Sequence, residues 1–295
     1  MENLNTEVGN IYFSWKKTFW LYIMLVPIAF IDFKAITFFD SILVIALTIV
    51  TVGLGHSVGL HRGIIHKSYD TSSRYRNVGL FLFILTGLGS PLSWLKQHYY
   101  RDYWQNREDC PRYFRYQHSL ITDYWWNLHL QFSPVDEELY QIPTIDLNDK
   151  TINHLHKYWY LYYLSFLLIL YVLFGLNTAL LASCFRTSLI ILGHWYIGFA
   201  SHKYGYAKHE IQNADESGYN DVLLGFVSFG EGFHNNHHAF PTSAKFSSRW
   251  YEVDFGWFLV WLLKKLKVVS NVKTQKHTLK STATPFERLK WKFPW

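Results

Sequence analysis

Four long apolar segments alternate with polar stretches along the chain. They cover residues 19–31, 36–55, 158–175 and 179–200. A helix needs about 20 mostly apolar residues, within a range of roughly 17–25, to cross the hydrocarbon core of a bilayer. Three segments meet this requirement and the first is short. Because the connections at 32–35 and 176–178 leave room only for tight turns, the pattern predicts four transmembrane helices arranged as two hairpins.

This arrangement places both termini and two long polar regions on the same side of the membrane. The polar regions, 56–157 and 201–268, are expected to form a helical cap, within which the glycine-broken apolar stretch 78–92 is expected to be a partly immersed helix. Basic residues flank the spans on this side: Lys16, Lys17, Lys264, Lys265 and Lys267. The positive-inside rule then assigns the cap to the cytoplasm. We expect residues 1–268 to form one integral, multi-pass, all-α membrane domain, followed by a basic tail at 269–295.

Composition agrees with a membrane protein. Hydrophobic residues make up 49 % of the chain and charged residues only 17 %, against about 25 % charged residues in a typical soluble domain. A net charge of +6 suggests nucleic acid for a soluble protein, but for a membrane protein it marks the cytoplasmic face; we therefore expect membrane lipid, and no nucleic acid, as a partner. The two cysteines, Cys110 and Cys184, form no CxxC motif and exclude a disulfide scaffold.

Histidine is the unusual residue, with 15 copies. Seven of them fall in four remote segments that the topology brings to the cytoplasmic side: His61, His66, His98, His202, His234, His237 and His238. Imidazole is a good ligand for iron, copper or zinc. On a helix His234, His237 and His238 share one face. The pattern predicts a multi-histidine metal centre, whereas we expect structural roles for His56, His118, His129, His154, His156, His194, His209 and His277.

Several motifs identify a family resemblance. GHSVGLHRGIIHKSY at 55–69, residues 198–205, DESGYN at 215–220, GEGFHNNHHAFP at 230–241 and residues 250–263 resemble the membrane acyl-CoA and acyl-lipid desaturases of the Δ9 type, which include the stearoyl-CoA desaturases. The resemblance implies four transmembrane helices below a cytosolic cap and a histidine-bound di-iron centre. It also implies a fatty acyl thioester or acyl lipid as substrate, O2 as oxidant, and cytochrome b5 or a ferredoxin as electron donor.

The second histidine motif departs from the family pattern. Where the family has HRxHH, this chain has His98, Tyr99, Tyr100, Arg101 and Asp102. The asparagine of the family's NSxxH motif is also replaced, by Gly198. Asp102 follows His98 by four residues, so a helix directs both to one site, and a carboxylate is an acceptable iron ligand. The expected ligands are therefore the seven histidines and Asp102.

Three interpretations of this departure remain open. The first is a working desaturase with two iron ions and an altered centre. The second is a centre in which one ion is weak or absent, with hydroxylation, acetylenation or halogenation of the acyl chain as the outcome. The third is an inactive protein that binds lipid or metal. A metal transporter, the rival from another class, would place its ligands inside the spans, where His194 and Arg186 are the clear candidates.

Basic and aromatic residues near the motifs are candidates for substrate binding. Arg62, Lys67, Arg74 and Lys96 are suited to a phosphorylated head group, and equally to anionic lipid. Trp94 and Arg101 are further candidates because of their place beside His98, and Arg101 has the charge to hold a substrate carboxylate or to pair with Asp102.

Overall fold

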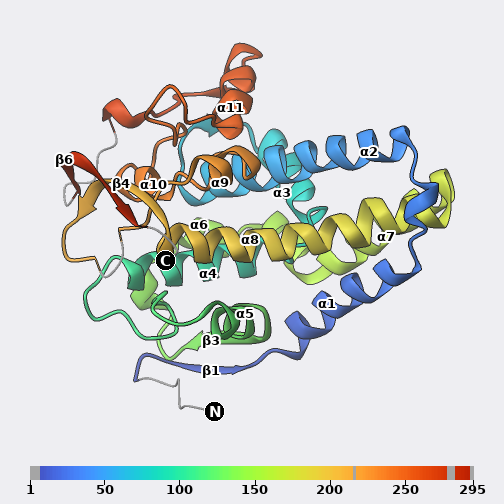
Figure 1. Ribbon diagram of the computed structural model, residues 1–295, viewed down its shortest axis with the longest axis horizontal. Helices are drawn as coiled ribbons and strands as arrows, with labels where there is room; N and C mark the ends of the chain where they lie inside the picture. The colour runs from blue at the N-terminus through green and yellow to red at the C-terminus, as the bar shows by residue number, and fades with distance from the viewer. Residues whose placement is uncertain (1–6, 215–216, 278–282, 293–295) are drawn as a thin grey trace.

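The computed structural model describes residues 7–214, 217–277 and 283–292, and these are mostly helical (Figure 1). Residues 215 and 216, which open the DESGYN motif, lie outside the described residues, as do 278–282 and 293–295 of the expected tail.

The first hairpin is built from helices that change their winding along their length. Helix α1 (Trp15–Leu25) starts at the Ser14 cap and continues as the 3-10 helix η1 (Val26–Phe30). After the short turn η2 (Phe33–Ala35), α2 (Phe38–Thr48) begins at a capping box and runs on as the π-helix η3 (Ile49–Ile65). Together α2 and η3 form an apolar helix that is long enough to cross a membrane.

The second hairpin lies between the two regions of the cap in the sequence. Helix α7 (Lys150–Leu180), the π-helix η5 (Leu181–Phe185) and α8 (Arg186–Lys203) form the other stretch that is long and apolar enough to cross a membrane. The backbone leaves the helical conformation at Gly175, where φ is +82°. Glycine adopts positive φ without the steric cost that a Cβ brings. The break therefore falls just before the 176–178 connection that the sequence predicts.

The tips of the two hairpins contact each other. The Asp32 amide donates to the Asn177 side chain at 2.8 Å, and the Asn177 amide group donates back to the Asp32 carbonyl at 3.1 Å. Thr178 donates to Asp40 at 2.6 Å. Both turns therefore lie at one end of the helical bundle, away from the histidine segments at the other end (Figure 1).

The cap contains shorter helices around that other end. They are α3 (Ser73–Ile84), α4 (Pro91–Gln105), α5 (Leu120–His129), η4 (Glu138–Tyr140), α6 (Thr144–Leu147), α9 (Val222–Val227), α10 (His234–Ala239), α11 (Phe255–Lys265) and η6 (Gln275–His277). The stretch 78–92, expected to be one partly immersed helix, is divided between α3 and α4. Helix α3 packs closely on η3: a Cβ on Gly55 would lie 2.5 Å from the Leu82 backbone. Such an approach requires a residue without a side chain.

Three small antiparallel ribbons correct the all-α expectation. Strand β1 (Gly9–Phe13) pairs with β3 (Leu130–Pro134), β2 (Asp70–Thr71) with β5 (Val269–Ser270), and β4 (Gly205–Ile211) with β6 (Ala283–Lys292). Two of these ribbons include segments of the expected tail. Strands β5 and β6, within the expected tail, are thus held to the cap by backbone hydrogen bonds.

Candidate metal centre

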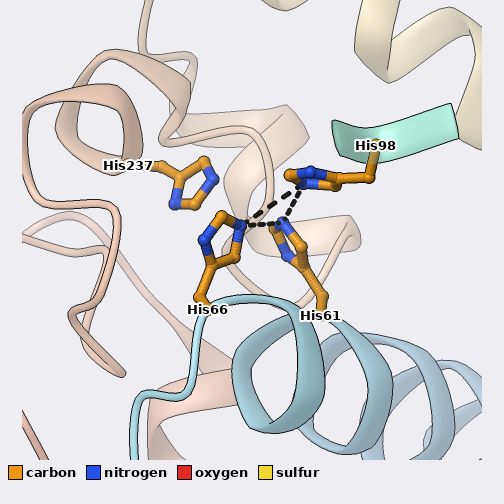
Figure 2. Close-up of side chains that lie close together, drawn as sticks. All are labelled: His61, His66, His98 and His237. Atoms are coloured by element: carbon orange, nitrogen blue, oxygen red, sulfur yellow. Dashed lines mark hydrogen bonds between the residues drawn. The ribbon is translucent and has the colours of Figure 1, made fainter. Parts of the chain in front are cut away.

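Four histidines from three helices converge where the first hairpin meets the cap. His61 lies near the end of η3 and His66 caps it, while His98 comes from α4 and His237 from α10. The Nε2 atom of His61 lies 3.0 Å from those of His66 and His98, and the latter two are 3.3 Å apart (Figure 2). His237 completes the set, since one ligand nitrogen of each residue lies within 4.8 Å of the others. We call these residues the four-histidine group.

The geometry of this group fits a metal ion. A Glu231 oxygen lies 2.6 Å from the Nδ1 atom of His61, and an Asp102 oxygen lies 3.2 Å from that of His98. Carboxylates behind imidazoles whose other nitrogens converge are typical of metal-binding histidines. Metal–imidazole bonds are about 2.1 Å long, so two nitrogens on one ion at a right angle lie about 3 Å apart, as they do here.

A second set lies next to the first. It consists of His202, near the end of α8, with His234 and His238 on α10. The Nε2 atom of His234 lies 3.0 Å from those of both His202 and His238. The Tyr116 ring stacks on His202 with a centroid distance of 4.4 Å. We call this set the three-histidine group.

The short helix α10 supplies both groups, and the two asparagines between its histidines fix it in place. Asn235 accepts from the backbone of Lys208 at 2.8 Å and donates to the His209 carbonyl at 2.7 Å. Asn236 donates to Phe246 and Glu252. Buried amides rarely lack partners, so the HNNHH sequence combines three inward imidazoles with two anchors.

The environment also favours the form of histidine that binds metal. Burial, with the neighbouring histidines adding to it, lowers the pKa of His234 and His237 well below the usual value. Both imidazoles are therefore neutral at physiological pH, and neutral imidazole is the ligand form.

The two residues that replace family histidines lie outside both groups. Asp102, expected as a ligand, contacts His98 from the side away from the other imidazoles. Arg101 donates to Tyr116 at 2.6 Å and to the Asn127 side chain. It forms no ion pair with Asp102 among the described residues.

The expected substrate-binding cations have separate positions. Arg62 has an exposure of 0 % and contacts Glu231 at 2.8 Å and Asp254 at 3.1 Å, so its guanidinium is unavailable to a head group. Lys67 lies 3.8 Å from Asp146, Lys96 lies 2.6 Å from Glu137, and Arg74 is exposed. These three remain surface candidates.

A cavity of about 660 Å³ runs from the apolar bundle to both histidine groups. That volume is within the usual range for ligand pockets, about 300–1,000 Å³. Apolar side chains such as Trp20, Val44 and Leu189 line one part, and His61, His98, His202, His234 and His237 line another. Trp94, a candidate for substrate binding, belongs to the lining.

Sequence reasoning did not find several lining residues. Lys17 and Asn127 face the cavity. The Trp94 ring contacts His56 and His194, with centroids 4.7 and 4.8 Å away, and these two rings contact each other at 5.1 Å. Glu231 was also missed, although its place three residues before His234, inside the GEGFHNNHH motif, is a signal that could have found it.

Comparison with known proteins gives a single answer. The family model for fatty acid desaturases matches residues 40–257, which is most of the chain. The chain belongs to the fatty acid desaturase family. A relative named sn-1 stearoyl-lipid 9-desaturase, from Anabaena variabilis, is 28 % identical over 228 residues, which cover 76 % of this chain and 80 % of the relative.

Two further relatives show the range of the family's chemistry. The sn-2 palmitoyl-lipid 9-desaturase of Nostoc sp. is 29 % identical, over 74 % of this chain and 76 % of its own. The hex-5-enoyl-[acyl-carrier protein] acetylenase of Moorena producens is 25 % identical, over 75 % of this chain and 73 % of its own. The resemblance seen in the sequence motifs is thus confirmed.

Proposed function

We propose that this protein is an oxidoreductase that removes two hydrogens from an unactivated part of a fatty acyl chain, using O2 and two electrons. The observation that carries the proposal is the cavity, because an apolar passage ends against two groups of convergent imidazoles. An alkyl chain in that passage lies beside metal ligands and away from bulk water.

Two iron ions are the proposed cofactor, one in the four-histidine group and one in the three-histidine group. When bound, iron supplies the oxidising chemistry, because no protein side chain can remove hydrogen from a methylene. The chain's own residues position the reactants. Trp94, in contact with His56 and His194, bounds the passage beside His98 and restricts which carbons lie against the ligands.

Glu231 and Asp102 have outer roles in this proposal. Each lies beside the Nδ1 atom of a histidine, on the side away from the converging Nε2 atoms. Such carboxylate–histidine pairs fix the tautomer and ring orientation of a metal ligand. We therefore propose Asp102 as a residue that orients His98, and the seven histidines as the ligands.

We further propose four membrane spans with the metal centre on the cytoplasmic side. The contacts between Asp32, Asn177 and Thr178 support this, because they hold the two turns together at the end opposite the histidines. Many large apolar side chains on η1, α2 and α7 are exposed, including Phe30, Phe38, Ile45, Val172 and Leu173. A bilayer would cover such a surface.

The proposed partners follow from the family. The named relatives act on acyl lipids or on an acyl group carried by acyl-carrier protein, and an acyl lipid or acyl thioester is the proposed substrate here. Cytochrome b5 or a ferredoxin is the proposed electron donor. These relatives are desaturases and an acetylenase, so they favour removal of hydrogens over hydroxylation, halogenation or an inactive scaffold.

The test is mass spectrometry of fatty acyl groups from cells that express the wild type or the His237→Ala variant, grown with and without O2. We expect O2-dependent species two mass units lighter in the wild type alone. Purified wild type should contain about two iron ions per chain. A wild type without O2-dependent product, or a variant that retains it, contradicts the proposal.

A further inference from the structure

Three cations belong to the described lining of the cavity. Arg186, at the start of α8, donates to Thr51 and to the carbonyls of Ala182 and Leu85, and the other two lie closer to the metal centre. Lys17, at the start of α1, and Arg101, on α4, both belong to its lining. Both contact the same residue: the Lys17 ammonium donates to the Asn127 carbonyl at 3.2 Å, and the Arg101 guanidinium donates to the Asn127 side chain. The two charges therefore lie side by side on one wall.

Neither Lys17 nor Arg101 has a carboxylate within ion-pair distance among the described residues. The charge of Asp123 acts on Arg101 from farther away, but this carboxylate is held by His118 at 2.5 Å and by Trp195 at 2.7 Å. The two carboxylates of the cavity lining are engaged elsewhere, Asp102 with His98, and Glu231 with His61 and Arg62. Burying one charge without a counterion is costly, and burying two neighbouring like charges costs more.

Donor capacity also remains unused. Arg101 directs two of its five N–H groups to Tyr116 and Asn127, and Lys17 directs two of its three to the carbonyls of Asn127 and Leu130. Burial, reinforced by the charge of Arg101, lowers the pKa of Lys17 to about 7. An anion between the two groups would accept hydrogen bonds from the unused donors. It would also stabilise the Lys17 ammonium and so raise the pKa of Lys17.

We propose that Lys17 and Arg101 form a binding site, inside the cavity, for the anionic head group of an alkyl-chain substrate: a carboxylate or a phosphate. The inference rests on the proposed function, because it treats the cavity as the substrate site. It differs from a head group held by Lys67, Arg74 or Lys96, which lie on the protein surface.

The position of this site bears on substrate class. Arg101 donates to Tyr116, and the Tyr116 ring stacks on His202 of the three-histidine group. One side chain therefore separates the proposed head-group site from a proposed metal ligand. Of the two proposed substrate classes, an acyl lipid with a small anionic head fits an internal site of this kind, whereas an acyl thioester of coenzyme A would leave its charged part at the surface.

The test compares three probes that share one alkyl chain: hexadecanoate, hexadecyl phosphate and methyl hexadecanoate. Equilibrium binding is measured with the purified full-length protein in a non-ionic detergent. We expect at least one of the two anions to bind ten-fold or more tightly than the neutral ester, and the tighter anion identifies the head group. Equal binding of all three probes overturns the inference.

Variants locate the site. Arg101→Gln and Lys17→Met should each weaken binding of the preferred anion by about ten-fold and leave the ester unchanged, and Arg101→Lys should restore part of the loss. Lys16→Met is the matched control, because Lys16 is exposed, packs over Trp159 and lies outside the cavity lining. An Arg101→Gln or Lys17→Met protein that keeps its iron and thermal stability but binds the anion normally contradicts the assignment.

This assay needs neither O2 nor an electron donor, so it is independent of the proposed reaction. Anion binding without O2-dependent product would leave the binding site standing and reject the oxidoreductase. If O2-dependent product forms but anion binding does not depend on Lys17 and Arg101, the oxidoreductase stands and the binding site is rejected.

Discussion

The four-histidine group and the three-histidine group differ in how their imidazoles are supported. In the first, carboxylates of Glu231 and Asp102 contact the outer nitrogens of His61 and His98, and Glu231 is itself held by buried Arg62. In the second, the Tyr116 ring stacks on His202. The first group has four imidazoles with carboxylates beside two of them, and the second has three imidazoles with an aromatic neighbour.

This difference predicts two sites of unequal affinity. Outer carboxylates raise the basicity of imidazole ligands and fix their tautomers. An additional ligand adds a further metal bond. We therefore expect the four-histidine group to bind iron more tightly, and the three-histidine group to keep coordination positions free on the side that faces the cavity. Each variant below changes one side of this comparison.

The largest effect is expected from His234→Ala. Its Nε2 atom lies 3.0 Å from those of both other members, so its loss leaves two imidazoles in the three-histidine group. Iron should fall from about two ions to about one per chain, and O2-dependent product should disappear. Iron analysis of the purified variant measures this. Two retained ions would mean that the groups do not each hold one, and thermal unfolding serves as the control for folding.

The next effect concerns stability. Arg62 is fully buried between Glu231 and Asp254 and also donates to the Ala244 carbonyl. Arg62→Met removes the cation and leaves two buried carboxylates uncompensated, which typically costs about 3–5 kcal/mol. Unfolding of the purified protein in detergent should show this loss. Arg74→Met, at an exposed position, is the control; a similar shift in both variants would contradict a specific role for the buried pairs.

A smaller effect is expected for Glu231→Gln. Loss of an outer carboxylate typically weakens metal binding 10- to 100-fold. Competition with a chelator should therefore remove one of the two ions from the variant sooner than from the wild type. Asp102→Asn should weaken binding less, because Asp102 is partly exposed and 3.2 Å from His98, against 2.6 Å for Glu231 and His61. A larger effect for Asp102 would indicate that it is a direct ligand.

These residues also show what the sequence was able to predict. The helical hairpins and the seven histidines follow from apolar runs and from motif spacing, which are local signals. The roles of Asp102 and Arg101 do not follow from such local signals, because they depend on the direction in which each side chain leaves α4. Helix α4 directs His98 toward the other imidazoles and Arg101 toward Asn127, on a segment more than 20 residues away.

Contacts between residues far apart in the sequence explain the other features that the sequence did not predict. Glu231 contacts His61 and Arg62, which are about 170 residues earlier in the chain. Lys17 resembles an ordinary flanking cation until the structure brings it to Asn127. The strand β6 pairs with β4 across some 80 residues, and the composition of a basic tail carries no sign of such a partner.

The smallest effect is expected for Tyr116→Phe, which separates the hydrogen bond of the Tyr116 hydroxyl from the stacking of its ring. The variant keeps the ring that stacks on His202 but loses the hydroxyl that accepts from Arg101 at 2.6 Å. A lost hydrogen bond to a charged group costs about 1.5–3 kcal/mol at most, and less where water or a neighbour replaces it. Iron content should stay near two, while affinity for a 16-carbon anion falls by a few fold. Tyr116→Leu removes the ring as well, so it alone should loosen the iron of the three-histidine group; equal iron loss in both variants would show that the hydroxyl, and not the stacked ring, supports His202.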